Sequence, residues 1–191
     1  EYVEAPATVA YNHFGNKLAT LVAFNKAGIA EQVYKNVAMQ VAAMNPIAVD
    51  ECDVAEEVKE KEIAVAIEKT KAEQVQKAVD AALKKAGINP AHVDSEDHME
   101  SNKAKGWITE EDVVKAKEII ATVSAEKAAN LPEAMIQNIA KGRLGKFLKE
   151  VCLLNQDDVT SEDKKTVRES LKAVDAELSV VSFKRVNLNV D

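Results

Sequence analysis

Aromatic residues are scarce in this sequence of 191 residues, at 4% of the chain, although apolar residues make up 47%. The apolar content is mostly alanine and valine, which suits closely packed helices better than a large, aromatic-lined ligand pocket. No run approaches the roughly 18 apolar residues of a membrane helix, and the first residues lack the pattern of a signal peptide. These absences predict a cytoplasmic protein with no membrane partner.

Cysteine and positive charge are also limited. Cys52 and Cys152 are far apart in the sequence and have no zinc-binding spacing, so we predict two free thiols in a reducing compartment. The 25 basic residues are outnumbered by 32 acidic ones, giving a net charge of −7. Because such a surface repels phosphate backbones on average, we expect no nucleic-acid partner, with a local basic patch as the remaining exception.

The N-terminal part has the pattern of a β-hairpin followed by a helix. Segment 7–13 alternates apolar and other residues, segment 17–25 does so less cleanly, and Phe14-Gly15-Asn16 between them is a turn signal. From Ile29 to Met44 the apolar residues recur every three to four positions, which predicts a helix. Asn45-Pro46 ends this helix, because the residue before a proline avoids the helical region.

The middle of the chain predicts a helical hairpin. Segment 54–87 contains no proline and only a final glycine, and a helix of about thirty residues would be ~45 Å long. Its narrow apolar stripe requires a partner helix, for which 109–129 is the candidate. That segment starts with Thr109 and Asp112, the spacing of an N-terminal cap. The polar segment 88–107 between the two helices predicts an irregular, exposed loop.

The C-terminal part predicts two helices and two strands. A helix begins at Leu131-Pro132 and carries apolar residues as far as Leu148. Segment 150–154, EVCLL, has strand character, and 163–173 predicts a short helix. A final strand is expected, with Val186, Leu188 and Val190 alternating with Asn187 and Asn189. Its phase slips near Lys184, because Val181 and Phe183 are odd-numbered, so we expect a bulge or a change of partner there.

These elements predict an α+β fold with a small antiparallel sheet packed against helices. Strands from both ends of the chain form the sheet in this interpretation. We predict a discontinuous core of residues 1–58 and 130–191, with an inserted antiparallel helical hairpin, a coiled coil, at 59–129. The inserted arm is a candidate surface for homodimerisation, because a narrow apolar stripe is covered either within the hairpin or by a second copy.

Catalytic and metal-binding patterns are weak. HVDSEDHME, from His92 to Glu100, contains two histidines and four carboxylates that could coordinate a transition metal, but polar residues gather in exposed loops anyway and no second ligand cluster supports the site. Cys152 lies in an expected strand, where a buried structural thiol is the default. We therefore predict no catalytic residues, no metal and no cofactor, which is the pattern of a protein that is not an enzyme.

Two glycines three positions apart, Gly142 and Gly145, lie beside basic residues in KGRLGKF. The spacing differs from that of a phosphate-binding Walker loop. It resembles the backbone clamp of KH domains, so a KH-like RNA-binding module using Gly142 and Gly145 is the alternative function. That clamp must be a loop, whereas apolar residues at helical spacing run through this segment from Met135 to Leu148. We therefore predict a helix surface that packs or docks closely on another surface.

Four stretches resemble the bacterial elongation factor Ts family. KNVAMQVAAMNP is similar to the family's "H-I-A-M-x-V-A-A-x-x-P" helix, and EKEIAVAI to the start of its coiled-coil segment. AMIQNIAKGRLGKFLKEVCLLNQ is similar to the signature "I-x-E-K-M-V-E-G-R-x-x-K-F-x-x-E-V-x-L-x-x-Q". Tyr11-Asn12-His13 followed by Lys17-Leu18 resembles the family's "Y-x-H-G-x-R-I-G-V-L-V" hairpin. The resemblance covers nearly the whole chain except roughly 70–128, where this sequence has a longer arm.

The resemblance implies a partner and a function. Elongation factor Ts releases GDP from elongation factor Tu, and Tu is the enzyme of the pair. Ts favours the nucleotide-free state of Tu by differential binding. A plain structural coiled-coil adaptor is a further alternative, which predicts no affinity for Tu.

The same resemblance implies two partner-binding residues. His13 matches the family histidine that approaches the nucleotide domain of Tu, and Val159 matches a valine just beyond the family's "Q-P-F-V" turn. Here Gln156 is followed by Asp157-Asp158 instead of Pro-Phe, and Lys17 stands where the family has arginine, with one extra residue in the turn.

The family's "T-D-F-V" motif, whose Asp-Phe pair intrudes near the magnesium and nucleotide of Tu, is not in this sequence. Its N-terminal helical module is also not in this sequence. Since the first residue is Glu1 rather than Met, we expect a fragment of a longer protein, or a processed chain. We predict that this chain binds Tu weakly and does not catalyse nucleotide exchange at the full rate.

Overall fold

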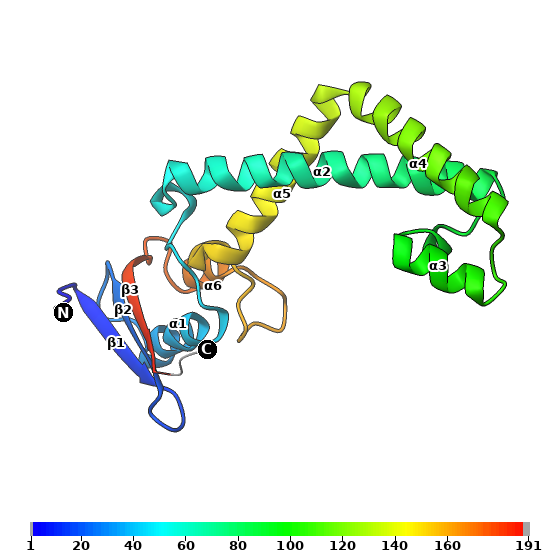
Figure 1. The fold of residues 1–191 in the computed structure, drawn as a ribbon. Coiled ribbons are helices and arrows are strands. Elements are labelled where there is room, and N and C mark those ends of the chain that lie inside the picture. The colour runs from blue at the N-terminus through cyan, green and yellow to red at the C-terminus, as the bar shows by residue number, and fades with distance from the viewer. Residues whose placement is uncertain (1, 189–191) are drawn as a thin grey trace. The chain divides into compact units, whose positions relative to one another are not determined.

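The computed structural model describes residues 2–188 and has an α+β fold, as predicted (Figure 1). The chain divides into two compact units. The first contains the residues up to Glu60 together with those from Leu144 onward, and the second contains Lys61–Arg143. No helix in the described part of the chain is both long enough and apolar enough to span a membrane.

A three-stranded antiparallel sheet forms one layer of the first unit. Strands β1 (Ala7–Asn12) and β2 (Leu18–Phe24) form the predicted hairpin, and β3 (Val180–Asn187) pairs with β2, so the order is β1-β2-β3. Gly15 and Asn16 occupy the turn with φ of 88° and 55°, a region that glycine and asparagine tolerate. Both ends of the chain therefore contribute to one sheet, as predicted.

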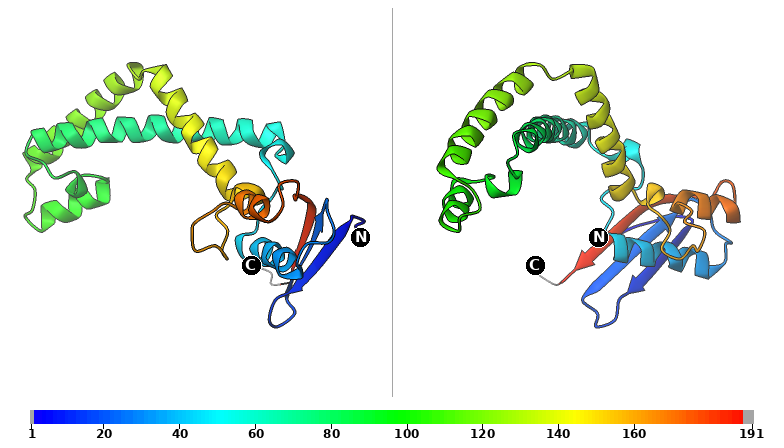
Figure 2. Two further views of the ribbon diagram at one scale, coloured as in Figure 1. Left: turned by 180° about the vertical axis from the view of Figure 1, so that it is seen from behind. Right: turned by 90° about the vertical axis from the view of Figure 1, so that its right-hand side faces the viewer.

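Two helices lie on the same side of the sheet (Figures 1 and 2). Helix α1 (Glu31–Met44) contacts β1 and β2, and helix α6 (Val167–Val174) joins the same hydrophobic core. The core side chains are at most 8% exposed and include Val22, Phe24, Val37, Val41 and Leu171. Helix α1 ends at Asn45 in the left-handed conformation, directly before Pro46 as predicted.

The second unit contains most of helix α2 (Glu56–Lys85), helix α3 (Glu96–Ala104), helix α4 (Glu110–Ala129) and the first part of helix α5 (Glu133–Val151). Thr109 and Asp112 form the predicted capping box of α4. Side chains near the C-terminal end of α2, such as Leu83, share a core with α4 residues such as Ala116. A coiled-coil pairing of α2 with α4 stays a prediction.

The segment predicted to be an irregular loop, 88–107, is folded, so that prediction is wrong. It contains a 3-10 helix (Pro90–His92) and α3, which Ser95 caps by accepting the His98 N–H at 3.2 Å. The buried Asn102 amide donates to the His92 carbonyl at 3.1 Å. Three widely spaced apolar residues fix the segment to the core of this unit, Ile88, Val93 and Met99, together with Ile108 directly after it. Their irregular spacing has neither helical nor strand periodicity, which is why the sequence pattern did not reveal them.

The segment EVCLL is not a strand. Helix α5 continues to Val151, and a 3-10 helix η3 (Leu153–Asn155) follows. The apolar run has another cause. Residues 151–154 are hydrogen-bonded through their backbone to residues 47–49, and the Leu153 N–H donates to the Ala48 carbonyl at 2.9 Å. Leu153 and Leu154 are buried there, and burial on all sides gives the same apolar run as a strand does.

Two further predictions in the C-terminal part need correction. Helix α6 begins at Val167 rather than Asp163, because Thr166 and Glu169 form a capping box. The register shift in the sheet lies opposite Ala23 and Phe24, where Val181 is the extra residue of β3, and not near Lys184. Asn189 and Val190, which were expected to extend the strand, lie outside the described residues.

Candidate partner-binding site

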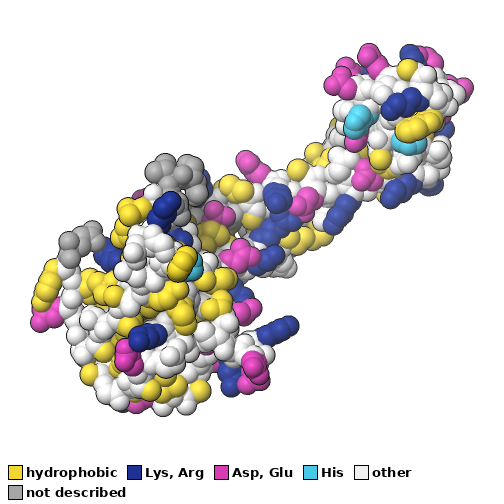
Figure 3. Space-filling model, turned by 90° about the horizontal axis from the view of Figure 1, so that it is seen from below, with side chains coloured by type: hydrophobic (Ala, Val, Ile, Leu, Met, Phe, Trp, Pro, Cys, Tyr) yellow, Lys and Arg dark blue, Asp and Glu magenta, His cyan; other side chains and the backbone are white. Residues whose placement is uncertain are grey.

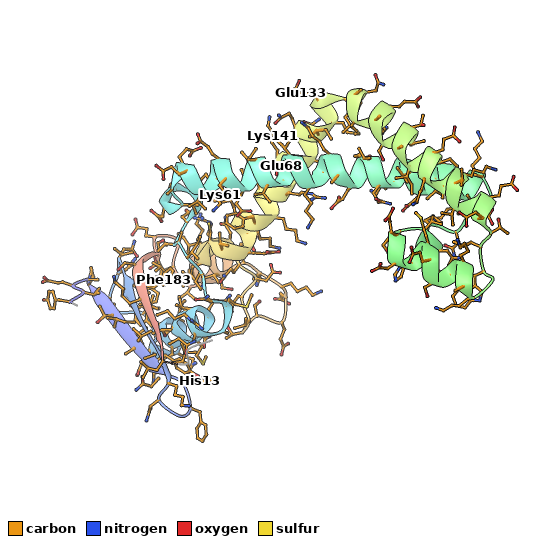
Figure 4. All side chains as sticks on the ribbon, in the orientation of Figure 1. His13, Lys61, Glu68, Glu133, Lys141 and Phe183 are labelled. Carbon is orange, nitrogen blue, oxygen red and sulfur yellow. The ribbon has the colours of Figure 1, made fainter. Side chains whose placement is uncertain are left out.

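His13 lies in the turn between β1 and β2, at the end of the hairpin (Figure 4). Its N–H donates to the Leu18 carbonyl at 2.8 Å, and its carbonyl accepts the Asn16 N–H at 3.0 Å, so the backbone of the turn is ordered. The imidazole is exposed, with Nδ1 3.1 Å from the Tyr11 hydroxyl oxygen. Phe14 beside it is 98% exposed, so an imidazole and an apolar ring are both exposed at this turn.

Val159 lies in a loop of residues 156–166, called here the 156–166 loop. The base of this loop is closed by a bridge between Asp157 and Thr166 and by the Val167 N–H donating to the Gln156 carbonyl at 3.0 Å. The Val159 side chain is 53% exposed. An apolar side chain on an ordered loop is a feature of docking surfaces, because little conformational entropy is lost on binding.

Asp158 orders the same loop from within. Its Oδ1 accepts the Thr160 N–H at 2.8 Å and the Thr160 hydroxyl at 2.7 Å. Burial acts to raise the pKa of Asp158, but hydrogen bonds from Ser170 and Thr160 outweigh it and hold this pKa below its ordinary value. The Asp158 carboxylate thus helps to fold the loop.

Gln40, on helix α1, connects the core of the first unit to this loop. Its side chain is 1% exposed. Its Oε1 accepts the Val159 N–H at 2.9 Å, and its Nε2 donates to the Asp157 carbonyl at 3.1 Å and to Gln156 Oε1 at 3.2 Å. Gln40 was not among the residues that the sequence pointed to. The available signal was an amide between Val37 and Val41 on the apolar side of a helix, since buried amides need partners.

A pocket of about 170 Å³ lies between α1 and α6 beside this network. Its wall is mainly apolar, with Asn36, Gln40, Asp158 and Ser170 as its polar members, and its apolar residues are Val33, Val37, Val167, Leu171 and Val174. This volume is below the roughly 300 Å³ at which typical small-molecule pockets begin.

Gly142 and Gly145 lie inside helix α5 and are exposed. The clamp of a KH domain requires a loop at this position, so the helix contradicts the KH-like alternative. Neither glycine packs closely within the described residues, because a Cβ built on either one meets no atom within 4 Å apart from the neighbouring backbone of its own helix, so close docking on a partner stays a prediction. Lysine and arginine side chains are interspersed with acidic ones on the face drawn in Figure 3, which does not present an extended basic surface.

The segment from His92 to Glu100 does not gather metal ligands. His98 Nδ1 lies 2.5 Å from Asp94 Oδ1, whereas the His92 ring packs against Trp107 with 5.5 Å between centroids. Among residues 2–188 no group of three or more histidine, cysteine or carboxylate side chains is arranged to hold a metal ion.

Both cysteines are free thiols, as predicted. Cys52 is exposed and Cys152 is buried. Burial, reinforced by the nearby carboxylates of Glu51 and Asp50, raises the pKa of Cys152 to about 11. A thiol held in its neutral form is a poor nucleophile, which fits a structural role for Cys152.

Comparison with known proteins decides the family. The family model "Elongation factor TS" matches residues 1–85 and 63–190. The chain belongs to the elongation factor Ts family. It is 73% identical over 190 residues to elongation factor Ts of Bacteroides thetaiotaomicron, covering 99% of this chain and 57% of that protein. The identity to the Bacteroides fragilis protein is the same, and it is 70% for Parabacteroides distasonis.

This membership makes the chain part of a family of translation elongation factors. The chain spans 57% of the length of these relatives. The resemblance of the four stretches to elongation factor Ts is confirmed by these matches.

Proposed function

We propose that this chain binds elongation factor Tu and promotes the release of GDP from it, as a binding protein and not as an enzyme. The observation that carries the proposal is the 73% identity to elongation factor Ts over 99% of the chain. Because exchange factors act by preferring the nucleotide-free state of their partner, no catalytic group is required in the chain itself. The proposed place of action is the cytoplasm.

We assign His13 and Val159 to the Tu-binding surface within this proposal. Both belong to the first unit, both are exposed, and each is set on an ordered backbone by hydrogen bonds. An exposed imidazole at a hairpin turn and an exposed valine on a closed loop fit contacts that lose little entropy on binding. The experiment below tests both residues.

Isothermal titration of the chain into Tu·GDP and into nucleotide-free Tu measures the preference directly. We expect tighter binding to nucleotide-free Tu. Release of a fluorescent GDP from Tu, followed by stopped flow, should be accelerated but should remain below the full rate of a complete exchange factor. Equal affinity for both forms of Tu, or no binding, contradicts the proposal, and a full exchange rate contradicts the expected partial activity.

Substitutions test the assigned residues. Val159→Asp is expected to weaken binding to Tu about tenfold, because the exposed apolar side chain assigned to this contact is replaced by a charge. Val114→Asp on α4 is the matched control, since Val114 is 61% exposed and lies in the second unit. His13→Ala is compared in the same way with His98→Ala on α3. Equal losses in a variant and its control contradict the assignment.

Homodimerisation through α2 and α4 is a separate part of the proposal. Analytical ultracentrifugation distinguishes a monomer of 20.8 kDa from a species of twice that mass. A monomer at every concentration measured rules out the dimer and leaves the Tu-binding proposal unaffected.

A further inference from the structure

The side chain of Gln40 uses both halves of its amide on one short segment. The carbonyl oxygen accepts from the backbone N–H of Val159 at 2.9 Å, while the NH2 group donates to the Asp157 carbonyl and to the Gln156 side chain at 3.1 and 3.2 Å. An amide is suited to this position because it supplies two donors and an acceptor in one plane. These hydrogen bonds join helix α1 to residues more than a hundred positions later in the chain.

Gln156, which accepts from the Gln40 NH2 group, extends this network to helix α5. It is 2% exposed, and its Nε2 donates to the Glu150 carbonyl at the end of helix α5 at 2.8 Å. The two buried amides therefore form a chain of hydrogen bonds from α5, through Gln156 and Gln40, to the backbone of Val159. Buried amides without partners are costly, so this network orders the loop that its members contact.

Hydrogen bonds within the 156–166 loop have a different role, because they determine the shape of the loop. The Asp157–Thr166 bridge and the hydrogen bonds that Asp158 accepts from Thr160 close the loop and shape it. They connect loop residues to one another, whereas Gln40 connects the loop to helix α1. Without the Gln40 amide, the Val159 N–H loses its acceptor and the Asp157 carbonyl loses a donor.

We propose that Gln40 is a positioning residue that presents Val159 to elongation factor Tu. The inference rests on the proposed function, in which Val159 docks on Tu. Gln40 itself is 1% exposed, so it acts through the loop and not through contact with the partner. By holding the exposed valine in one orientation before binding, it lowers the entropy lost on docking.

Two buried polar side chains of the first unit give a matched pair of variants. Gln40→Met keeps the length and approximate shape of the side chain and removes its hydrogen bonds. Thr20→Val serves as the control: Thr20 is 3% exposed and its hydroxyl donates to the Ala38 carbonyl at 2.9 Å. Both variants remove buried hydrogen bonds that involve helix α1, but only Gln40→Met removes hydrogen bonds to the 156–166 loop.

The first measurement is amide hydrogen exchange by NMR, made at a temperature where both variants are folded. We expect exchange at the Val159 N–H to be at least about tenfold faster in Gln40→Met, because its acceptor is gone. In Thr20→Val it should be unchanged. Unchanged exchange at Val159 in Gln40→Met, or equal acceleration in both variants, overturns the ordering role of Gln40.

The second measurement is a double-mutant cycle for affinity to nucleotide-free Tu. We expect Gln40→Met to weaken binding about tenfold in the original chain and hardly at all in a Val159→Ala background, because both act through the same contact. Thr20→Val should leave the affinity unchanged. Additive losses, or an equal loss in Thr20→Val, show general destabilisation and overturn the proposal.

The two measurements separate the failure of this inference from that of the proposed function. If the original chain does not bind Tu, the proposed function fails and the docking role of Gln40 fails with it, while the exchange experiment still reports whether Gln40 orders Val159. If Tu binds and the cycle shows no coupling, the proposed function stands and the positioning role is overturned.

Discussion

The guanidinium of Arg168 on α6 lies 2.7 Å from Oδ1 of Asp50, which precedes the 3-10 helix η1 (Glu51–Asp53). Arg168 also donates to Asn155 Oδ1 at 3.3 Å, and the Asn155 amide donates to Glu51 Oε1 at 2.8 Å. These contacts join η1 and the residue before it to two segments that lie more than a hundred residues later in the chain. They hold α6 and η3 in the first unit beside the connection from α1 to α2.

Arg168→Ala should destabilise the first unit modestly. The ion pair is about one-third exposed at both side chains, so solvent screens it and we expect a loss of only about 1 kcal/mol in the free energy of unfolding. This corresponds to a decrease in Tm of about 2–4 °C for a chain of this size. Lys172→Ala, an exposed basic residue on the same helix, is the control for differential scanning calorimetry. Equal decreases in both variants contradict a specific role of the Arg168–Asp50 pair.

Acid should weaken the fold through Asp50 and Asp158. For both carboxyl groups burial acts to raise the pKa, but hydrogen bonds outweigh it: from Arg168 and the Glu51 N–H for Asp50, and from Ser170 and Thr160 for Asp158. Their folded pKa values are therefore below the unfolded value of about 4. The stabilisation is present above that value and is lost as the pH falls through the folded pKa.

Urea unfolding at pH 5 and pH 3 measures this effect. We expect the original chain to lose more stability between these two pH values than Asp50→Asn or Asp158→Asn, which cannot gain a proton at that position. Glu162→Gln is a control on an exposed loop residue. The same loss in all four proteins would show that these two carboxyl groups do not carry the pH dependence.

The two cysteines should differ strongly in reactivity. Cys52 is exposed, whereas Cys152 is buried with a pKa of about 11, so little of it is thiolate at pH 8. We expect Ellman's reagent to modify one thiol per folded chain rapidly and the second only after unfolding in guanidinium. Cys52→Ser should abolish the rapid phase and Cys152→Ser should leave it intact. Rapid modification of two thiols in the folded original chain would contradict the burial of Cys152.

Gly142→Ala and Gly145→Ala should stabilise helix α5. Both glycines are exposed inside the helix, and an added methyl group meets no atom within 4 Å. Alanine is favoured over glycine in a helix interior by about 1 kcal/mol, so each substitution should raise Tm by about 2–4 °C. Asn138→Ala, on an exposed position of the same helix, controls for general effects of helix propensity. A decrease in Tm would mean that these positions need glycine for a reason other than helix geometry.

Local patterns determined much of this protein. Turn residues between alternating segments predicted the hairpin of β1 and β2, Asn45-Pro46 predicted the end of α1, and Thr109 with Asp112 predicted the start of α4; all are confirmed. These signals act within a few residues of the backbone that they shape, so no knowledge of distant contacts is needed. The family resemblance is also a property of the sequence alone, and it supplied His13 and Val159 as site residues, which stays a prediction.

Tertiary contacts decided the rest. EVCLL is apolar because residues 47–49 lie against it. Segment 88–107 is folded because scattered side chains such as Val93 and Met99 pack into the core of the second unit. Gly142 and Gly145, whose spacing resembles the clamp of a KH domain, lie in a helix and are exposed, and their spacing alone could not show this. Gln40 acquires a role only because α1 and the 156–166 loop meet in space. A buried amide is stable only where its partners are, and those partners are chosen by the packing of segments that the sequence places more than a hundred residues apart.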